Sequence, residues 1–265
     1  MLTHFPVALP DEVLYSRLAR WHLHSGSRSP KQTLDDLFGN RSVRAAIDLQ
    51  RHLRALSERI SELTPCSPQD LLRQTLFGYY ASHQTAGMAR MAMGAMIDGQ
   101  ASGLHARLGI AAGTRLPPCP LRWCPRCHAA AMRQHSESFW RRAHQLPGVL
   151  VCPSHGLPLR NARLPEAVGQ HEFIAATFRT CPPEDPSLPD WAESPETIQL
   201  LWDIAQKSAR LLDHPAPAPS LSALTDQCRD RLITADLALP SGRLRISRLN
   251  FFNLQKTFSM RWHQT

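Results

Sequence analysis

Two short cysteine-containing pairs constrain this sequence more than any other feature. The first reads Cys-Pro-Arg-Cys at Cys124 and Cys127, and the second reads Cys-Pro-Ser-His at Cys152 and His155. Two residues separate the potential ligands in each pair, which lets both side chains turn back onto one ion. Zn²⁺ prefers four sulfur and nitrogen ligands arranged as a tetrahedron. The spacing therefore predicts a structural Zn²⁺ site held by these four residues.

Other interpretations of the two pairs fit the sequence less well. A thioredoxin-like Cys-Pro-Arg-Cys stands inside a βαβ unit, and no strand-rich sequence surrounds this one. A zinc deaminase needs His-x-Glu followed by Pro-Cys-x-x-Cys, and only the first part is present, at residues 135–137. Catalytic zinc also keeps an open coordination position, whereas this set fills all four. We therefore expect no catalysis at this metal.

Several residues near the pairs remain open in role. Cys119 precedes Cys124 by five residues and is an alternative ligand, as are His128 and His135. Phe139 and Trp140 lie between the two pairs and are expected to pack the small metal module, which has little core of its own. The remaining cysteines are isolated and are interpreted as buried or incidental thiols: Cys66, Cys181 and Cys228.

Helical patterns dominate the rest of the chain. Residues 11–24 carry apolar side chains at helical spacing, and a second short helix is expected from Pro30 to Gly39, with Ser29 as its N-cap. Two such helices fit a helix-turn-helix or any helical hairpin. Residues 41–63 predict one longer helix with a buried side formed by Val43, Ile47, Leu53, Leu56, Ile60 and Leu63.

Further helices are expected along the chain, and the fold class is mainly α. One begins after Pro68, residues 195–214 form an amphipathic helix, and the last segment gives a helix, a Pro-Ser-Gly turn and a second helix. The Met-rich residues 88–99 suit a pliable core or a protein contact. Residues 172–178 are the one extended candidate.

Changes in composition predict three regions. Residues 1–110 form a helical N-terminal region with the helix-turn-helix, residues 111–165 an embedded Cys3His zinc module, and residues 166–265 a basic helical C-terminal region. A Pro-rich lead-in precedes the module, and the proline-rich residues 215–220 form a stiff linker.

The formal net charge is +8, and only three of the 30 basic residues are lysines. The planar fork of arginine suits phosphate groups, so the charge favours a polyanionic partner, although arginine-rich composition and solvated helix faces explain part of it. No apolar run is long enough to cross a bilayer and no signal-peptide pattern is present, so we expect a cytoplasmic, nucleoid-associated protein. The candidate phosphate contacts are Arg41, Arg44, Arg141, Arg142, Arg243, Arg245 and Arg248.

The segment "RWCPRCHAAAMRQHSESFWRRAHQLPGVLVCPSHGLPL" resembles the signature of the TniQ family, especially its TnsD-like members. The shared elements are Arg-x-Cys-Pro-x-Cys, a basic Phe-Trp-x-Arg, His-Gln-Leu-Pro-Gly and Cys-Pro-x-His-Gly. The N-terminal stretch is similar too, through Pro-x-x-x-Glu-x-x-Tyr-Ser, Ser-Pro-Lys-Gln and Gly-Asn-Arg. The resemblance spans most of residues 4–160 and is looser from residue 161 on.

This resemblance implies a target-selection factor for DNA transposition that is not an enzyme. Such a factor binds double-stranded DNA at the insertion site and recruits an AAA+ ATPase of the TnsC type, which engages the transposase. The family's zinc ligands carry over onto Cys124, Cys127, Cys152 and His155, and its helix-turn-helix onto roughly residues 12–38. The alternative is an adaptor that docks on an RNA-guided CRISPR effector, often as a homodimer, without DNA sequence specificity of its own.

One departure from the family pattern bears on DNA recognition. TnsD-like proteins usually continue well past the point at which this sequence stops, inside an expected C-terminal helical DNA-binding region. A short member of the family and a shortened chain both fit this observation. The resemblance therefore implies contact with the ATPase more directly than it implies sequence-specific reading of DNA.

Overall fold

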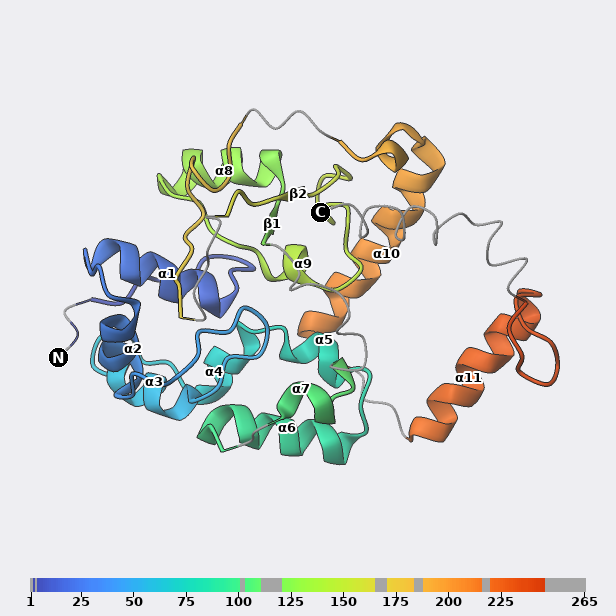
Figure 1. Cartoon of the computed structure of the whole chain (residues 1–265), viewed down its shortest axis with the longest axis horizontal. Helices are drawn as coiled ribbons and strands as arrows, with labels where there is room; N and C mark the ends of the chain where they lie inside the picture. The colour runs from blue at the N-terminus through green and yellow to red at the C-terminus, as the bar shows by residue number, and fades with distance from the viewer. Residues whose placement is uncertain are drawn as a thin grey trace.

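The computed structural model describes residues 2, 4–100, 103–110, 121–164, 171–183, 188–215 and 220–245. Within this part the fold is mainly helical with one two-stranded sheet, which confirms the expected class (Figure 1). The helices in chain order are α1 Leu14–His24, α2 Pro30–Phe38, α3 Leu53–Ile60, α4 Pro68–Arg73, α5 Phe77–Ala81, α6 Ala86–Asp98, α7 Leu104–Arg107, α8 Pro125–His135, α9 Arg142–Gln145, the 3₁₀ helix η2 Asp190–Glu193, α10 Pro195–Asp213 and α11 Leu221–Thr234.

The two strands bring the ends of the metal module together. Strand β1 (Arg122–Trp123) pairs antiparallel with β2 (Arg160–Asn161), and Trp123 lies opposite Arg160. Strand β1 comes directly before the first cysteine pair along the chain, and β2 comes after the second pair. The sheet is therefore the base from which both pairs extend.

Helix α2 forms as its capping residues predict. Ser29 accepts a hydrogen bond on its side chain from the Gln32 amide, Pro30 occupies the first turn, and Gly39 ends the helix with a φ of 67°. Glycine adopts this left-handed conformation without the steric cost that a Cβ imposes. Both helices of the predicted helix-turn-helix are therefore present as α1 and α2, and their role on DNA stays a prediction.

The prediction of one continuous helix over residues 41–63 is wrong, because only α3 is helical there. The Gln50 side chain supplies hydrogen bonds that a helix would otherwise make: its oxygen accepts from the Ala46 amide at 2.8 Å, and its nitrogen donates to two backbone carbonyls of the same loop. His52 then adopts a φ of 62°, which a right-handed helix excludes. Side-chain amides that bond the backbone compete with helix formation in this way.

Three other predictions from the sequence differ from the structure, and one is confirmed. The helix after Pro68 is divided into α4 and α5, residues 172–178 form no strand, and Leu63 is 39% exposed. The turn at residues 240–242 is present. The helix expected beyond it begins at the edge of the described residues and lies mostly outside them.

The first hydrophobic core lies among α1, α2, α3, α4 and α6. The Met-rich α6 contributes Met96, which is fully buried, and Met88 and Met93 pack at its margin, so the core interpretation of this segment is confirmed. Burying each leucine contributes about 1.5–3 kcal/mol relative to leaving it exposed. The fully buried residues of this core include Leu18, Leu34, Leu37, Leu53, Leu56, Ile60 and Leu71.

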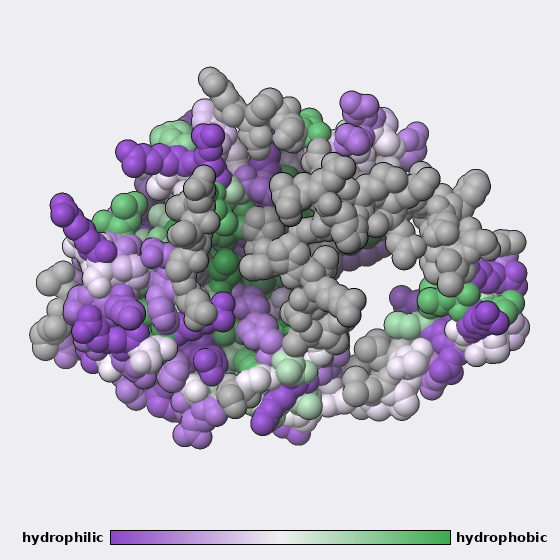
Figure 2. Space-filling model, in the orientation of Figure 1, coloured by the Kyte–Doolittle hydropathy of each residue, from purple (hydrophilic) through white to green (hydrophobic). Residues whose placement is uncertain are grey.

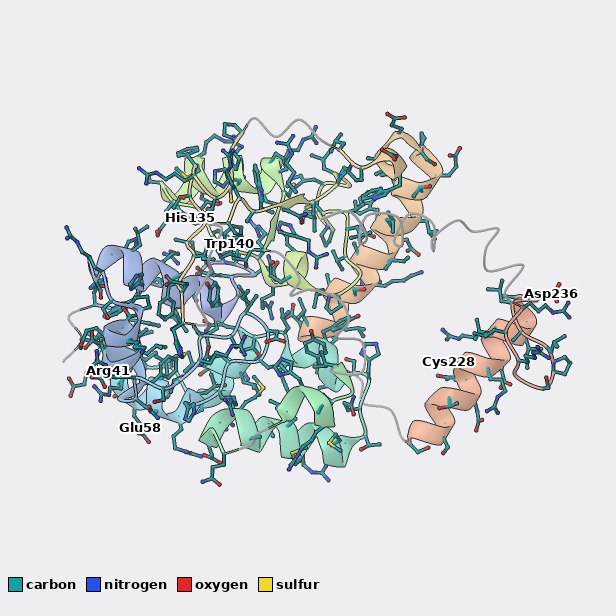
Figure 3. All side chains as sticks on the ribbon, viewed as in Figure 1. Arg41, Glu58, His135, Trp140, Cys228 and Asp236 are labelled. Atoms are coloured by element: carbon teal, nitrogen blue, oxygen red, sulfur yellow. The ribbon has the colours of Figure 1, made fainter. Side chains whose placement is uncertain are left out.

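A second core joins the N-terminal helices to the metal module and to α10. Trp140, from the segment between the two cysteine pairs, is fully buried here together with Val13, Leu76 and Ala205. Figure 3 places Trp140 between α1 and α8. Trp140 thus packs the junction of the module with α1, in addition to the module itself.

Buried charge reinforces the same junction. Arg20 of α1 pairs with Glu12 at 2.8 Å and with Glu137 of the module at 2.5 Å, and its side chain is 6% exposed. Burial raises the pKa of Glu12 even though the Arg20 charge opposes this effect. Removing one partner of such a pair leaves an uncompensated buried charge, so the pair specifies how the two regions dock.

Helix α11 and the turn after it lie apart from the other helices in Figure 1. No residue of α11 whose side chain is described is buried. The division of the chain into three regions stays a prediction, since the second core draws on all three. Among the described helices none combines the length and apolar character that a membrane span requires.

Helix α5 approaches α10 more closely than a side chain permits. A Cβ at Gly78 would lie 2.1 Å from the Leu212 carbonyl oxygen, which is backbone and cannot rotate away. Gly94, in the middle of α6, has no neighbouring atom within 4 Å of its Cβ position. The packing therefore requires glycine at position 78, whereas position 94 has room for a side chain.

We expect Gly78→Ala to destabilise the protein by about 1–3 kcal/mol, because α5 and α10 must separate. Gly94→Ala is expected to stabilise it by about 0.5–1 kcal/mol, because alanine favours the helix interior. Denaturant titration of both variants measures the free energy of unfolding. Equal effects of the same sign at the two positions would contradict the close packing of α5 on α10.

Candidate metal centre

The first cysteine pair stands where β1 leads into α8. Cys124 is the N-cap of α8 with extended backbone angles, Pro125 begins the helix, and Cys127 lies in its first turn. Proline suits this position because its fixed φ is helical and its missing N–H is not needed there. Both thiols are buried, at 0% and 5% exposure, and they point to the same side because the chain turns between them.

The second pair lies in a tight reversal of the chain. The Cys152 amide donates to the Leu157 carbonyl at 2.7 Å, and the Gly156 amide donates back to the Cys152 carbonyl at 2.9 Å. Gly156 has a φ of 63°, a left-handed conformation that glycine adopts without steric cost and that the reversal requires. Cys152 is fully buried and His155 is half-buried at the rim.

The four predicted ligands converge, and their ligand atoms all lie within 4.8 Å of one another. The Nδ1 atom of His155 is 3.5 Å from Sγ of Cys124, 3.3 Å from Sγ of Cys127 and 3.5 Å from Sγ of Cys152. Cys127 and Cys152 have their sulfurs 3.6 Å apart, which is too long for a disulfide.

These separations match the edges of a metal tetrahedron. With Zn–S and Zn–N bonds of ordinary length, tetrahedral angles place two sulfurs ~3.8 Å apart and a sulfur and a nitrogen ~3.6 Å apart. The donor set, three thiols and one imidazole, is also the one that soft and borderline metals prefer. The Cys3His cluster is therefore able to hold a metal ion, with Nδ1 as the histidine donor.

The thiols of the cluster influence one another's ionisation. Hydrogen bonds from Cys127 and Cys152 stabilise the Cys124 thiolate and lower the pKa of that thiol. Hydrogen bonding to Cys124 raises the pKa of Cys127, and it raises the pKa of Cys152 to about 11. Without a cation the cluster thus favours a single thiolate, whereas a bound dication stabilises all three.

The His144 imidazole also contacts the cluster, through Cys127, and was not among the residues predicted from the sequence. Its Nε2 atom lies 3.9 Å from Sγ of Cys127, and burial lowers the pKa of the imidazole to about 3. A neutral imidazole can donate its N–H to a thiolate, an interaction that orients metal ligands. The sequence signal for His144 was the His-Gln-Leu-Pro-Gly stretch shared with the family. The sequence does not show that this stretch lies beside Cys127.

The next residues of that stretch hold β1 in place. Gln145 accepts the Arg122 amide on its side-chain oxygen at 3.0 Å and donates to the Arg122 carbonyl at 2.9 Å. The Arg122 guanidinium donates to the carbonyls of Leu146 and Val149 at 2.7 and 2.6 Å. Arg122 is 5% exposed, so its role lies inside the module, where it aligns the two cysteine pairs.

The two histidines that were alternative ligands do not join the cluster. His128 points away, between the rings of Trp123 and Phe178 at centroid distances of 5.4 and 5.5 Å. His135, at the far end of α8, lies beside Phe139. Cys119 falls outside the described residues. The isolated cysteines are half-buried at 66, buried at 181 and exposed at 228.

The candidate phosphate contacts come from separate parts of the molecule. Arg41 and Arg44 are exposed on the loop after α2, whereas Arg243 and Arg245 follow α11, which lies apart from that loop in Figure 1. Arg245 also pairs with an aspartate at 3.4 Å. Arg248 is outside the described residues. The structure does not gather these arginines into one patch.

Two of the candidate arginines, Arg141 and Arg142, lie in the module and contact other residues of the protein. Arg141 stacks on the ring of Phe139 at 4.9 Å. Arg142 pairs with Asp11 at 3.2 Å and with Asp213 at 3.0 Å, and its side chain is 11% exposed. Arg142 thus links the module to both α10 and the segment before α1, and contact of either arginine with DNA stays a prediction.

Comparison with known proteins identifies relatives of this architecture. The TniQ family model matches residues 3–159, a range that contains the buried residues of the first core, both tryptophans of the second core and all four cluster residues. The transposon Tn7 transposition protein TnsD of Escherichia coli is 35% identical over 157 residues, which cover 58% of this chain and 31% of that protein. The aligned region thus spans about a third of the relative's length. Because the family model matches more than half of the chain, this protein belongs to the TniQ family.

Proposed function

We propose that this protein selects target sites for DNA transposition. In this proposal it binds double-stranded DNA at the insertion site and recruits an AAA+ ATPase of the TnsC type, without a catalytic step of its own. The observation that carries the proposal is membership of the TniQ family together with the similarity to a Tn7 transposition protein. The formal net charge of +8 supports a polyanionic partner.

We further infer that the metal of the Cys3His cluster is Zn²⁺ and that it is structural. The residues that would hold it are Cys124, Cys127, Cys152 and His155, and their donor atoms have separations suited to zinc. These four fill a tetrahedron and leave no position for a substrate. When bound, the ion supplies cross-linking of the two pairs and no reaction chemistry. His144 then orients Cys127 through a hydrogen bond.

The first test concerns the metal. We expect the purified protein to contain one zinc ion per chain, and Cys152→Ser to lose most of it together with thermal stability, because a serine oxygen is a poor zinc ligand. His144→Asn is expected to weaken zinc affinity by about 10–100-fold, because it removes the contact behind Cys127. Elemental analysis and competition with a chelator measure the two quantities.

Cys228→Ser is the matched control, since Cys228 is exposed on α11 and distant from the cluster. It is expected to retain its zinc and its melting temperature. A Cys152→Ser protein that still carries one zinc per chain would show that these four residues are not the ligand set.

The second test concerns DNA. A salt titration of binding to an attachment-site duplex and to a scrambled duplex is expected to show a steep linear fall of log affinity with log salt. Each neutralised phosphate contributes a slope of about −0.9. A preference for the attachment-site duplex supports a factor that reads its own target. Fluorescence anisotropy provides the affinities.

Weak binding whose affinity depends on neither the duplex sequence nor the salt concentration would overturn DNA recognition by this chain. Combined with a stable homodimer and capture by an RNA-guided effector, that outcome would favour the adaptor function instead. Recruitment of the ATPase is tested separately, by co-purification with a TnsC-type protein in the presence and absence of DNA.

A further inference from the structure

An open pocket of about 500 Å³ lies on the side of the molecule opposite to α11. Lys31, Arg41, Ser42 and His171 line it. Figure 3 shows Arg41 at the outer edge of the protein near α2, and the surface over α2 and α3 is largely hydrophilic in Figure 2. The pocket is thus lined by two permanent cations, one hydroxyl group and one imidazole.

The backbone that carries the first three lining residues is well fixed. Lys31 lies in the first turn of α2, and Gly39 ends this helix two residues before Arg41. The Ser42 amide then donates to Oδ1 of Asn40 at 2.9 Å, which holds the turn after the helix. These positions are therefore set by local structure and need no ligand to form.

The fourth lining residue comes from a distant part of the chain. His171 has its Nδ1 3.1 Å from the Val43 carbonyl, which ties it to the loop after Ser42. The Tyr15 hydroxyl donates to the Glu172 carbonyl at 2.9 Å and accepts from the Ile174 amide at 2.9 Å. The segment that carries His171 is thereby anchored on α1, and it closes the wall of the pocket.

The two cations of the pocket differ from several other basic residues of the protein in having no acidic partner among the described residues. Within the described part of the chain neither Lys31 nor Arg41 forms an ion pair, in contrast to Arg20 and Arg142, which contact carboxylates. Asp35 and Glu172, the acids that follow the lining residues in sequence, do not line the pocket. Two unpaired cations beside a hydroxyl donor match the needs of a phosphate group.

We propose that this pocket binds a phosphate group of a DNA backbone. The proposal rests on the proposed function, because it assigns to these residues one of the contacts through which the protein holds its target. Lys31 and Arg41 donate charge-assisted hydrogen bonds to the phosphate oxygens, and the Ser42 hydroxyl donates a neutral one. Because backbone phosphates occur at every step, the pocket sets position and affinity and carries no sequence information.

The test compares two double variants that lose the same charge. Lys31→Ala combined with Arg41→Ala is expected to weaken duplex binding about tenfold and to lower the salt slope by about 0.9, as loss of one phosphate contact requires. Arg54→Ala combined with Lys207→Ala is the control, since these exposed residues are already paired with Asp98 and Asp203. The control is expected to change affinity by less than about twofold.

Two outcomes would overturn the proposal, and they differ in what they say about the proposed function. Wild-type protein that binds DNA with a steep salt slope, and a pocket variant that behaves like the control, would overturn the pocket while leaving the proposed function intact. Wild-type protein that does not bind DNA would overturn both. Melting temperatures of the two double variants that match the wild type show that the expected loss is local.

A second measurement distinguishes backbone phosphate from a free one. Inorganic phosphate and adenosine monophosphate are titrated into the wild-type protein and into the pocket variant by calorimetry. No saturable binding is expected for either, because one phosphate contact alone is weak. Tight binding that the pocket variant loses would assign the pocket to a free phosphate or nucleotide and overturn its role on DNA.

Discussion

Trp140 is completely buried against α1, and the arrangement of the other elements depends on this contact. Its amide donates to the Ser16 hydroxyl at 2.9 Å, its carbonyl accepts from the Val13 amide at 3.0 Å, and its indole donates to the Ile174 carbonyl at 2.6 Å. One residue thus makes three hydrogen bonds to two other segments of the chain while filling the second core. Because a buried indole costs free energy unless its N–H is paired, only one docking of the module on α1 meets these requirements.

The metal module is organised around internal support of its two cysteine pairs. His144 contacts Cys127, while the Gln145 side chain bonds the Arg122 backbone and the Arg122 guanidinium bonds the carbonyls of Leu146 and Val149, which aligns the sheet. Part of the positive charge counted in the sequence lies inside the protein, since Arg20, Arg122 and Arg142 are buried or paired there. The surface available to a polyanion is therefore smaller than the composition suggests, and the unpaired cations beside α2 carry more of the argument.

The family match ends near β2, yet the packed structure continues beyond it. Ala205 and Leu212 of α10 belong to the second core, and the Trp202 indole donates to the Pro153 carbonyl at 2.7 Å, directly beside the second cysteine pair. Gly78 permits the C-terminal end of the same helix to approach α5. Helix α10 therefore packs against both the metal module and the N-terminal helices, and the packed unit extends beyond the matched region.

Local sequence determined those features whose causes are local. The spacing of two residues within each pair was sufficient to predict which four residues converge in the Cys3His cluster, and Ser29, Pro30 and Gly39 were sufficient to place α2, because caps and knuckles form from neighbours along the chain. Tertiary structure decided the rest. The Gln50 side chain bonds the backbone where a helix was expected within residues 41–63. His144 contacts Cys127, and His171 and Arg41 line the same pocket. Each of these depends on side chains far apart in sequence or on competition between side chain and helix, which periodicity does not record.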